Sequence, residues 1–412
     1  MNIYLLIILI ILTGEYILNT FADILNISRI EPGLPEEFRD VFSEDKYLIS
    51  QNYLKEKTSF SLFKETVFFI IILAFILTGG FNLVDLAVRK FNFPQIPTGL
   101  AFAGIIALGL QVINIPFSVY HTFVIEKKYG FNKTTPKTFI TDLLKSWIIG
   151  AAIGGILFTI IIWAFSRLGN YAWIYCWAAV TLIQIILIFL APVIIMPLFN
   201  KFKPLENNKL KKEIKEYAKS QNFAIKGIFE IDASKRSTKS NAFFTGFGKS
   251  RRIALFDTLI KNHTVDEIVS VLAHEIGHYK NRHIQKSIAI TVLNSGIMFF
   301  ILSRFINNPG LFEAFKTSHL SIYAGIFFFG ILYRPMNLIF SILANYISRK
   351  HEFQADKFAV ETYRKPQEFI SALKKLTAHN MGNLRPHPVK VILEYSHPPI
   401  LKRISAIKGF GA

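Results

Sequence analysis

The stretch YAWIYCWAAVTLIQIILIFLAPVIIMPLF, residues 171–199, contains no charged side chain. A helix of roughly 20 apolar residues is needed to cross about 30 Å of hydrocarbon, because in lipid each backbone polar group must be hydrogen-bonded within its own segment. Residues 171–199 are therefore predicted to span a membrane. Seven stretches of the chain qualify as spans on this basis, at residues 2–24, 66–88, 99–125, 146–166, 171–199, 287–306 and 320–347.

The composition of the whole chain agrees with an integral membrane protein. Of its 412 residues, 51% are apolar and 18% are charged, whereas soluble globular chains have roughly 25% charged residues. The N-terminal apolar stretch lacks the basic region and small-residue cleavage site of a signal peptide, so we expect it to remain as an anchor. Cys176 is the single cysteine, which excludes an internal disulfide and a thiolate-rich metal site. Any metal site must use His, Asp or Glu.

The formal net charge of +19 is concentrated in alternate connecting segments. Residues 26–64, 126–145, 201–286 and 348–412 hold 41 of the 47 Lys and Arg residues, whereas the opposite loops hold five. Lys and Arg are retained in cytoplasmic loops, so these polar blocks are predicted to face the cytoplasm, with the N-terminus outside. This placement accounts for the basic excess without nucleic acid, and we expect no nucleic-acid partner.

The residues that carry chemistry begin in HTVDEIVSVLAHEIGHYKNRH, residues 263–283. TVDE has the spacing of a capping box, and the apolar residues after it recur at helical spacing, so a helix is predicted to start here. His274 and His278 are four residues apart and share one face of that helix, with Glu275 beside them. In this HExxH arrangement two neutral imidazoles bind zinc, an open position takes water, and the adjacent carboxylate accepts a proton from that water. Glu275 is the expected general base.

A site with two histidines is incomplete, and the best candidate for a third ligand is Glu352 in SRKHEFQADKFA, residues 348–359. Glu352 and Asp356 are four residues apart and would share one helix face just beyond the seventh span. Glu352 would complete the set of zinc ligands. Asp356 could orient a ligand imidazole, as histidine ligands usually require.

Hydrolysis of an amide also needs a group that stabilises the developing oxyanion. The C-terminal YSHPP, residues 395–399, holds His397 in a proline-rich loop, and Arg403 follows six residues later. We expect His397 to donate a hydrogen bond and Arg403 to supply a positive charge. The remaining histidines match no ligand spacing and are interpreted as ordinary, with His283 turned off the ligand face: His121, His263, His283, His319, His351, His379 and His387.

These motifs resemble the type I CAAX prenyl endopeptidases, which are membrane zinc proteases that include the a-factor-converting enzyme. The resemblance spans nearly the whole chain and rests on four motifs in family order: KRSTKSNAFFTGFGKSRRIALFDTLI, VLAHEIGHYKNRH, HEFQADKFA and YSHPPILKRI. It implies seven helices around a large chamber, capped on the cytoplasmic side by the zinc domain. It also implies one zinc ion per chain and a set of matching site residues: the ligands His274, His278 and Glu352, the base Glu275, the supporting carboxylate Asp356, and the oxyanion donors His397 and Arg403.

The resemblance further places Asn241 and Ala242 on an edge strand that pairs with the backbone of an extended substrate. Two positions depart from the family pattern. Lys402 stands where the family usually has Glu, and the HEF sequence places His351 beside the proposed ligand where the family more commonly has Phe. His351 is expected to point elsewhere and is not predicted to be a ligand.

We therefore predict an all-α polytopic membrane protein of about seven helices that enclose a chamber, with a cytoplasmic zincin-like α+β metalloprotease domain. A Lys-rich amphipathic stretch at 207–223 and β-like runs at 226–234 and 251–259 would supply a helix and strands of that domain. Four regions are expected along the chain: five membrane helices in 1–200, a cytoplasmic zinc-protease segment with the HEIGH helix in 201–286, membrane helices six and seven in 287–347, and a cytoplasmic segment with the third ligand and the oxyanion residues in 348–412.

The predicted function is zinc-dependent cleavage of peptide bonds near the C-terminus of prenylated CAAX-type or other membrane-associated substrates, in a lipid bilayer. The membrane would be the inner membrane of a bacterium or the endoplasmic reticulum of a eukaryote. Two alternatives stay open: a general quality-control protease for membrane proteins, and a transporter or channel with a vestigial metal site. The oligomeric state and the need for prenylation are also left open.

Overall fold

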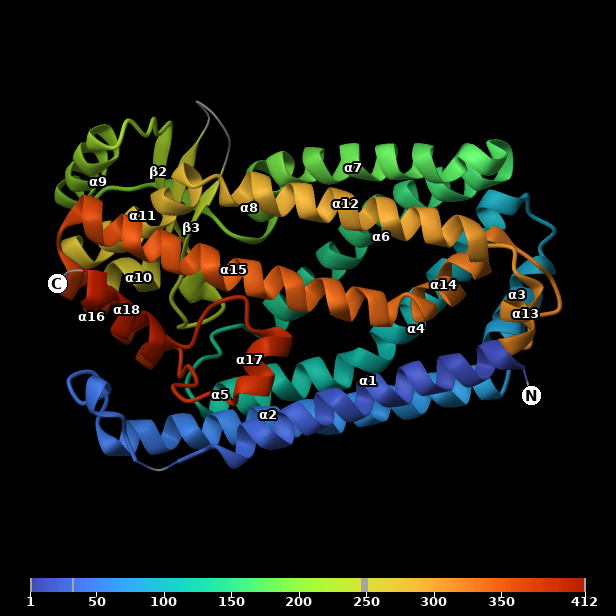
Figure 1. The fold of residues 1–412 in the computed structure, drawn as a ribbon, viewed down its shortest axis with the longest axis horizontal. Helices are drawn as coiled ribbons and strands as arrows, with labels where there is room; N and C mark the ends of the chain where they lie inside the picture. The colour runs from blue at the N-terminus through green and yellow to red at the C-terminus, as the bar shows by residue number, and fades with distance from the viewer. Residues whose placement is uncertain (1, 32, 246–250, 411–412) are drawn as a thin grey trace.

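The computed structural model describes residues 2–31, 33–245 and 251–410, and Figure 1 shows their arrangement. Within this part of the chain, six helical runs are long and apolar enough to cross a membrane, and a bent pair of helices makes a seventh. Four of the six runs are single helices: α1 (Ile3–Ser28), α2 (Glu44–Leu77), α6 (Pro136–Arg167) and α12 (His283–Phe305). The fifth run consists of α4 (Gln95–Tyr120), η2 (His121–Ile125) and α5 (Glu126–Lys128). The sixth consists of η3 (Gly169–Tyr171), α7 (Ala172–Leu190), η4 (Ala191–Ile195) and α8 (Met196–Phe199). The predicted fold class, a polytopic helical membrane protein with a small α+β domain, is confirmed.

The seventh span is bent and continues far beyond its apolar part. α14 (Ile322–Leu332) and α15 (Arg334–Tyr363) meet at 54° beside Pro335. A kink or helix end is predicted there, because proline lacks the N–H of the helical ladder and clashes with the preceding turn. α15 then runs without interruption into the polar C-terminal block. The same helix therefore carries both the end of the span and the motif that contains Glu352.

The predicted second span, residues 66–88, is wrong in its C-terminal half. α2 ends at Leu77, and a new helix, α3 (Gly80–Arg89), starts after Gly79, whose φ of +79° lies in the left-handed region. Glycine adopts this conformation without the clash that a Cβ atom causes. Since apolar residues continue through both helices, hydropathy alone does not reveal the turn. The segment long enough to span is α2, which begins at Glu44.

The six spanning runs bury few of their side chains. Only 6–17% of the residues in their most apolar windows are buried, whereas a packed helix buries a broad stripe of its surface. Most of these side chains therefore face lipid or an open interior. Figure 1 shows α1 beside α2 along one long edge and α7 beside α12 along the opposite edge, with α15 between them. An apolar core forms at the end remote from the sheet, around Phe81, Phe102 and Phe328.

A four-stranded sheet lies at the opposite end of the molecule from this apolar core (Figure 1). Its spatial order is β1 (Phe202–Pro204), β2 (Gly227–Ile231), β4 (Arg252–Phe256) and β3 (Ala242–Thr245). β2 and β4 run parallel, and each outer strand pairs antiparallel with its neighbour. The predicted β-like runs at 226–234 and 251–259 contain β2 and β4, but the first ends in the short helix η5 (Ala233–Lys235) and residues 257–259 of the second already belong to α10. Among the described residues, β3 is left at an edge of the sheet.

The helices around the sheet form one apolar core with it. They are α9 (Asn208–Ser220), α10 (Asp257–Asn262), α11 (Val265–Lys280), α16 (Pro366–His379) and α18 (Ile400–Phe410), whereas α17 (Pro388–Glu394) packs on α15 and α1. α11 starts at the predicted capping box, in which Thr264 and Glu267 each bind the other's backbone N–H through their side chains. Leu272 and Ile276 of α11 pack in the same cluster as Phe369. This core fixes the position of α11.

Candidate metal centre

α11 and α15 approach closely where the HEIGH and HEFQAD motifs meet. A Cβ atom added to Gly277 would lie 3.0 Å from the Cα atom of Ala355 and 3.1 Å from its carbonyl oxygen. Both contacts are with backbone, so neither can be relieved by a side-chain rotation, and glycine is needed for this separation of the helices. The contact brings together the four polar side chains on either side of it: His274, His278, Glu352 and Asp356.

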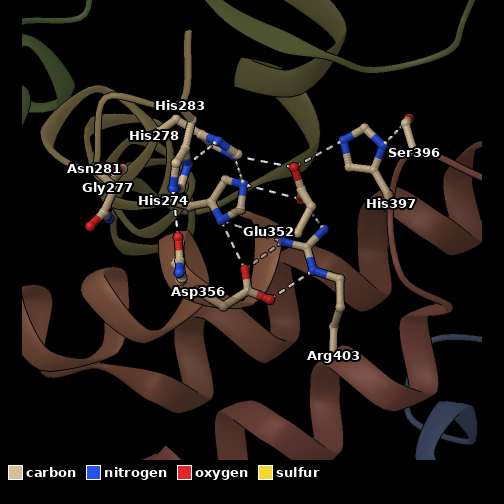
Figure 2. A network of polar contacts seen from close by, with 11 residues as sticks. His274, Gly277, His278, Asn281, His283, Glu352, Asp356, Ser396, His397 and Arg403 are labelled. Carbon is tan, nitrogen blue, oxygen red and sulfur yellow. Dashed lines mark hydrogen bonds and ion pairs between the residues drawn. The ribbon is translucent and has the colours of Figure 1, made fainter. Parts of the chain in front are cut away.

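Three donor groups from these two helices face one point, as Figure 2 shows. The Nε2 atoms of His274 and His278 are 3.1 Å apart, and Glu352 oxygens lie 3.5 Å from the first and 3.2 Å from the second. Two ligand atoms that are each about 2.0–2.1 Å from a tetrahedral zinc ion lie about 3.3–3.4 Å from one another. The observed separations therefore match the edges of a zinc coordination shell. Glu352 Oε2 is also buried without a hydrogen bond among the described residues, so the donor set fits a cation.

A buried carboxylate holds the second ring nitrogen of His274. Nδ1 of His274 lies 2.8 Å from Oδ1 of Asp356, which accepts its hydrogen. Arg403 holds Asp356 in turn, because its Nε donates to Oδ2 at 2.9 Å and its Nη2 donates to Oδ1 at 2.5 Å. With a hydrogen on Nδ1, His274 can present a bare Nε2 to a metal ion.

The same contacts set the protonation of His274 when no metal ion is bound. Burial alone would lower the pKa of His274, but the hydrogen bond to Asp356 and the nearby Glu352 carboxylate outweigh burial and raise the pKa to about 9. The imidazole is then protonated at neutral pH. A metal ion that binds must release this proton, since only a neutral imidazole is a ligand.

The donor groups open on a cavity of about 940 Å³. Glu275 and His397 line the cavity beside the donor groups. Much of the remaining wall is apolar and comes from α7, η4 and α12, with Ile185, Ile188 and Ile288 among its side chains. A carboxylate, a candidate metal site and an apolar surface therefore share one space.

The two predicted oxyanion residues lie in different surroundings. The His397 side chain is 63% exposed on the cavity, with its Nδ1 2.9 Å from the Ser396 hydroxyl and its Nε2 3.4 Å from Glu352 Oε1. Partial desolvation by the cavity wall lowers the pKa of His397, which favours the neutral ring. Arg403 is buried behind the carboxylates, with Nη1 3.4 Å from Glu352 Oε2, and is not among the described side chains that line the cavity.

His283 is the residue near the site that the sequence analysis missed. Its Nδ1 lies 3.0 Å from Nδ1 of His278. The prediction that His283 turns off the ligand face assumes that α11 continues, but α11 ends at Lys280 and α12 begins at His283. Asn281, which is frequent where helices end, was the available signal. His351 is not among the donor groups but stacks on His283, with ring centroids 3.9 Å apart.

The residues proposed to bind substrate backbone lie at the edge of the sheet. Ala242 begins β3 and pairs with Leu255 of β4. Asn241 is exposed just before β3, and its side-chain oxygen accepts the Ala242 N–H at 2.8 Å. Neither residue is among the described side chains that line the cavity. Residues 246–250 of the same motif lie outside the described residues.

Comparison with known protein families agrees with this geometry. The family described as "CAAX prenyl protease N-terminal, five membrane helices" matches residues 23–201, and "Peptidase family M48" matches residues 204–410. The chain belongs to peptidase family M48. As an M48 protein with this helical architecture, it is a multi-pass membrane metalloendopeptidase.

Similar proteins and a solved structure cover nearly the whole of this M48 chain. It is 34% identical to "CAAX prenyl protease 1 homolog" of Arabidopsis thaliana, over 96% of this chain and 95% of that protein. It is 33% identical to "CAAX prenyl protease 1" of Saccharomyces cerevisiae, over 92% of this chain and 89% of that protein. The crystal structure of S. mikatae Ste24p matches with a TM-score of 0.93 and 31% identity, over 98% of this chain and 99% of that chain.

Proposed function

We propose that the protein is a zinc endopeptidase that cleaves near the C-terminus of prenylated, CAAX-type substrates. The observation that carries the proposal is the arrangement of His274, His278 and Glu352 on a cavity that Glu275 also lines. Two imidazoles, one carboxylate and an open fourth position are the ligand set of catalytic zinc in metalloproteases. A zinc ion held there would supply a Lewis acid that makes water nucleophilic at neutral pH. Membership in a peptidase family sets aside the transporter or channel alternative.

The chain's own residues divide the proton and charge chemistry among them. Glu275 accepts the proton of the attacking water and returns it to the leaving amine. His397 faces the cavity as a neutral ring and donates its Nε2 hydrogen to the oxyanion. Arg403 acts in the proposed mechanism by fixing Asp356 and facing Glu352, because two of its donor nitrogens already bind Asp356.

Three features support a lipid-bearing, extended substrate. The cavity has an apolar wall at the level of the membrane helices α7 and α12, where an isoprenoid or apolar side chain can bury its surface. The edge strand β3, with Asn241 and Ala242 at its start, offers main-chain hydrogen bonds that tolerate many substrate sequences. The similar proteins carry the name CAAX prenyl protease.

The charge pattern supports a cytoplasmic site. Most Lys and Arg residues lie in the segments that carry or adjoin the donor groups, so these segments face the cytoplasm. In a eukaryote the membrane would be that of the endoplasmic reticulum, and in a bacterium the inner membrane. C-termini of prenylated proteins then approach the cavity from the side on which they are anchored.

Cleavage of matched peptides tests both the chemistry and the substrate class. Purified protein is incubated with farnesylated and unfarnesylated forms of one CAAX peptide, and the products are identified by mass. We expect preferential cleavage of the farnesylated peptide, whereas equal rates would favour a general quality-control protease. Glu275→Gln should keep its zinc and lose about 10²–10⁴-fold in rate. Turnover at the wild-type rate in this variant would reject Glu275 as the base.

The assignment of Glu352 as a ligand is tested by zinc content. Glu352→Ala removes one of the three proposed ligands, so the purified variant should lose bound zinc. Glu361→Ala is the matched control, because Glu361 lies on the same helix but is exposed and pairs with Lys357. Equal zinc content in the two variants would remove Glu352 from the ligand set.

A further inference from the structure

His283 reaches the donor groups through a tight turn between two helices. α11 ends at Lys280, Asn281 caps it with a side-chain hydrogen bond to the Gly277 carbonyl at 2.9 Å, and Arg282 adopts a left-handed conformation with φ of +57°. α12 then starts at His283, which is only 3% exposed. The turn folds His283 back against the ring of His278, as Figure 2 shows.

The hydrogen bonds of His283 have one consistent direction. Its Nε2 lies 2.9 Å from Oε1 of Gln354, and a side-chain amide oxygen can only accept a hydrogen bond. Nε2 of His283 therefore carries the hydrogen, and Nδ1 of the neutral ring is an acceptor. Because this acceptor lies 3.0 Å from Nδ1 of His278, the hydrogen of His278 is placed on Nδ1. Nε2 of His278 is then bare and faces the donor groups, as metal binding requires.

If the hydrogen bonds from Gln354 through His283 to His278 ran in the opposite direction, His278 could not bind a metal ion through Nε2. If the side-chain nitrogen of Gln354 donated to His283 Nε2, then His283 would carry its hydrogen on Nδ1 and donate it to His278. The hydrogen of His278 would then lie on Nε2, where it would block the lone pair. Whether Gln354 presents its oxygen or its nitrogen to His283 thus selects the tautomer of His278, which is two hydrogen bonds away.

We propose that Gln354 and His283 form a neutral hydrogen-bond relay that fixes His278 as an Nε2 ligand. The proposal rests on the proposed zinc site and adds two positioning residues to it. Ligand imidazoles are commonly oriented by such outer partners, whose loss typically costs about 10–100-fold in metal affinity. His351 supports the relay by stacking on the His283 ring, with an interplanar angle of 9°.

A matched pair of variants at residue 283 separates hydrogen bonding from packing. Asn and Leu have similar shapes, and both lose the stacking on His351. In His283→Asn the side-chain oxygen occupies the place of Nδ1 and can accept the hydrogen of His278, whereas His283→Leu offers no acceptor. The zinc affinity of the full-length protein in detergent is measured by competition with a chelator. We expect affinity within about threefold of wild type for Asn and about 10–100-fold weaker for Leu.

A second pair at residue 354 keeps the test independent of the folding of the residue 283 variants. Gln354→Glu retains an acceptor at the same place and should bind zinc at least as tightly as wild type. Gln354→Met has a similar length without the acceptor and should bind more weakly than Gln354→Glu, by about tenfold. Gln354 is exposed, so neither change should prevent folding.

The outcomes distinguish the relay from the zinc site itself. One zinc per wild-type chain with the expected order, Asn above Leu and Glu above Met, supports the relay. One zinc per wild-type chain with equal affinities within each pair overturns the relay and leaves the proposed function standing. Absence of zinc from folded, metal-supplemented wild-type protein overturns the proposed function, and the relay fails with it.

Discussion

The two candidate imidazole ligands lie one helical turn apart on α11, yet their surroundings differ in charge and exposure. His274 is held by Asp356, which is itself fully buried and bound to Arg403. His278 contacts the ring of His283, which in turn contacts the exposed Gln354. The side chain of His274 is 8% exposed and that of His278 is 21% exposed.

The proposed metal site would therefore have two physically different supports. Hydrogen bonds to charged groups are roughly twice as strong as neutral ones, but a buried charge that loses its partner is costly. The His274 side is therefore rigid and sensitive to any single change in its charged groups. His278 and His283 face the cavity, and the outer partners His283 and Gln354 include no carboxylate, so these two should tolerate replacement by other acceptors.

Removal of Asp356 should give the largest effect on stability. Among the described residues, Asp356→Leu leaves the buried Arg403 guanidinium with only the more distant Glu352 carboxylate as an ion-pair partner, which should destabilise the fold by about 3–5 kcal/mol. The midpoint of thermal unfolding in detergent, measured after zinc is removed with a chelator, reports the loss.

Two further variants show whether the charge is the cause. Asp356→Leu combined with Arg403→Met removes both charges and should recover much of the lost stability, since apolar replacement of a buried ion pair is often neutral. Gln354→Met, next to His283 and away from the charged groups around His274, should change stability by less than about 0.5 kcal/mol, as is usual for exposed positions. A double variant as unstable as Asp356→Leu would show that the unpaired charge of Arg403 does not cause the loss.

A change that pushes α11 and α15 apart should have an intermediate effect on stability and should weaken zinc binding. Gly277→Ala places a Cβ atom 3.0 Å from the backbone of Ala355, so α11 and α15 must move apart. Overpacking of this kind costs about 1–3 kcal/mol, and the donor groups should bind zinc more weakly. Gly409→Ala is the control, because nothing lies within 4 Å of a Cβ atom there. Equal thermal midpoints and zinc affinities for the two variants would contradict the close approach.

Relief of the strained turn before His283 should have a small effect on stability and none on zinc affinity. Arg282 adopts a left-handed conformation, which costs a residue with a Cβ atom about 1–2 kcal/mol. Arg282→Gly relieves this strain but adds freedom to the unfolded chain worth about 0.5–1 kcal/mol. The net change in stability should stay within about 1 kcal/mol, and zinc affinity should not change. A marked loss of zinc affinity would show that Arg282 itself supports the site.

Helical spacing made much of the candidate site predictable from sequence. His274 and His278, and likewise Glu352 and Asp356, are four residues apart, so one turn of helix places each pair on one face. The chain does not reveal how the two faces meet, which depends on the close approach at Gly277. His283 was missed because helical periodicity was extended through a residue in a left-handed turn.

Local composition also set the limits of the fold prediction. Hydropathy identified the apolar stretches, but it could not separate α2 from α3 because apolar residues continue through the turn at Gly79. Arg403 lies on α18 and its partner Asp356 on α15, 47 residues earlier in the chain, so their pairing depends on how these two helices pack. Contacts within one helix were thus predictable, whereas contacts between helices required the structure.

X-ray absorption at the zinc edge, with metal content measured on the same purified protein, tests whether His274, His278 and Glu352 bind zinc. The proposed ligand set predicts one zinc ion per chain, held by nitrogen and oxygen atoms at about 2.0–2.1 Å, with the scattering pattern of two imidazoles and no sulfur. Folded protein that takes up no zinc when the metal is supplied, or a spectrum without imidazole ligands, would contradict it.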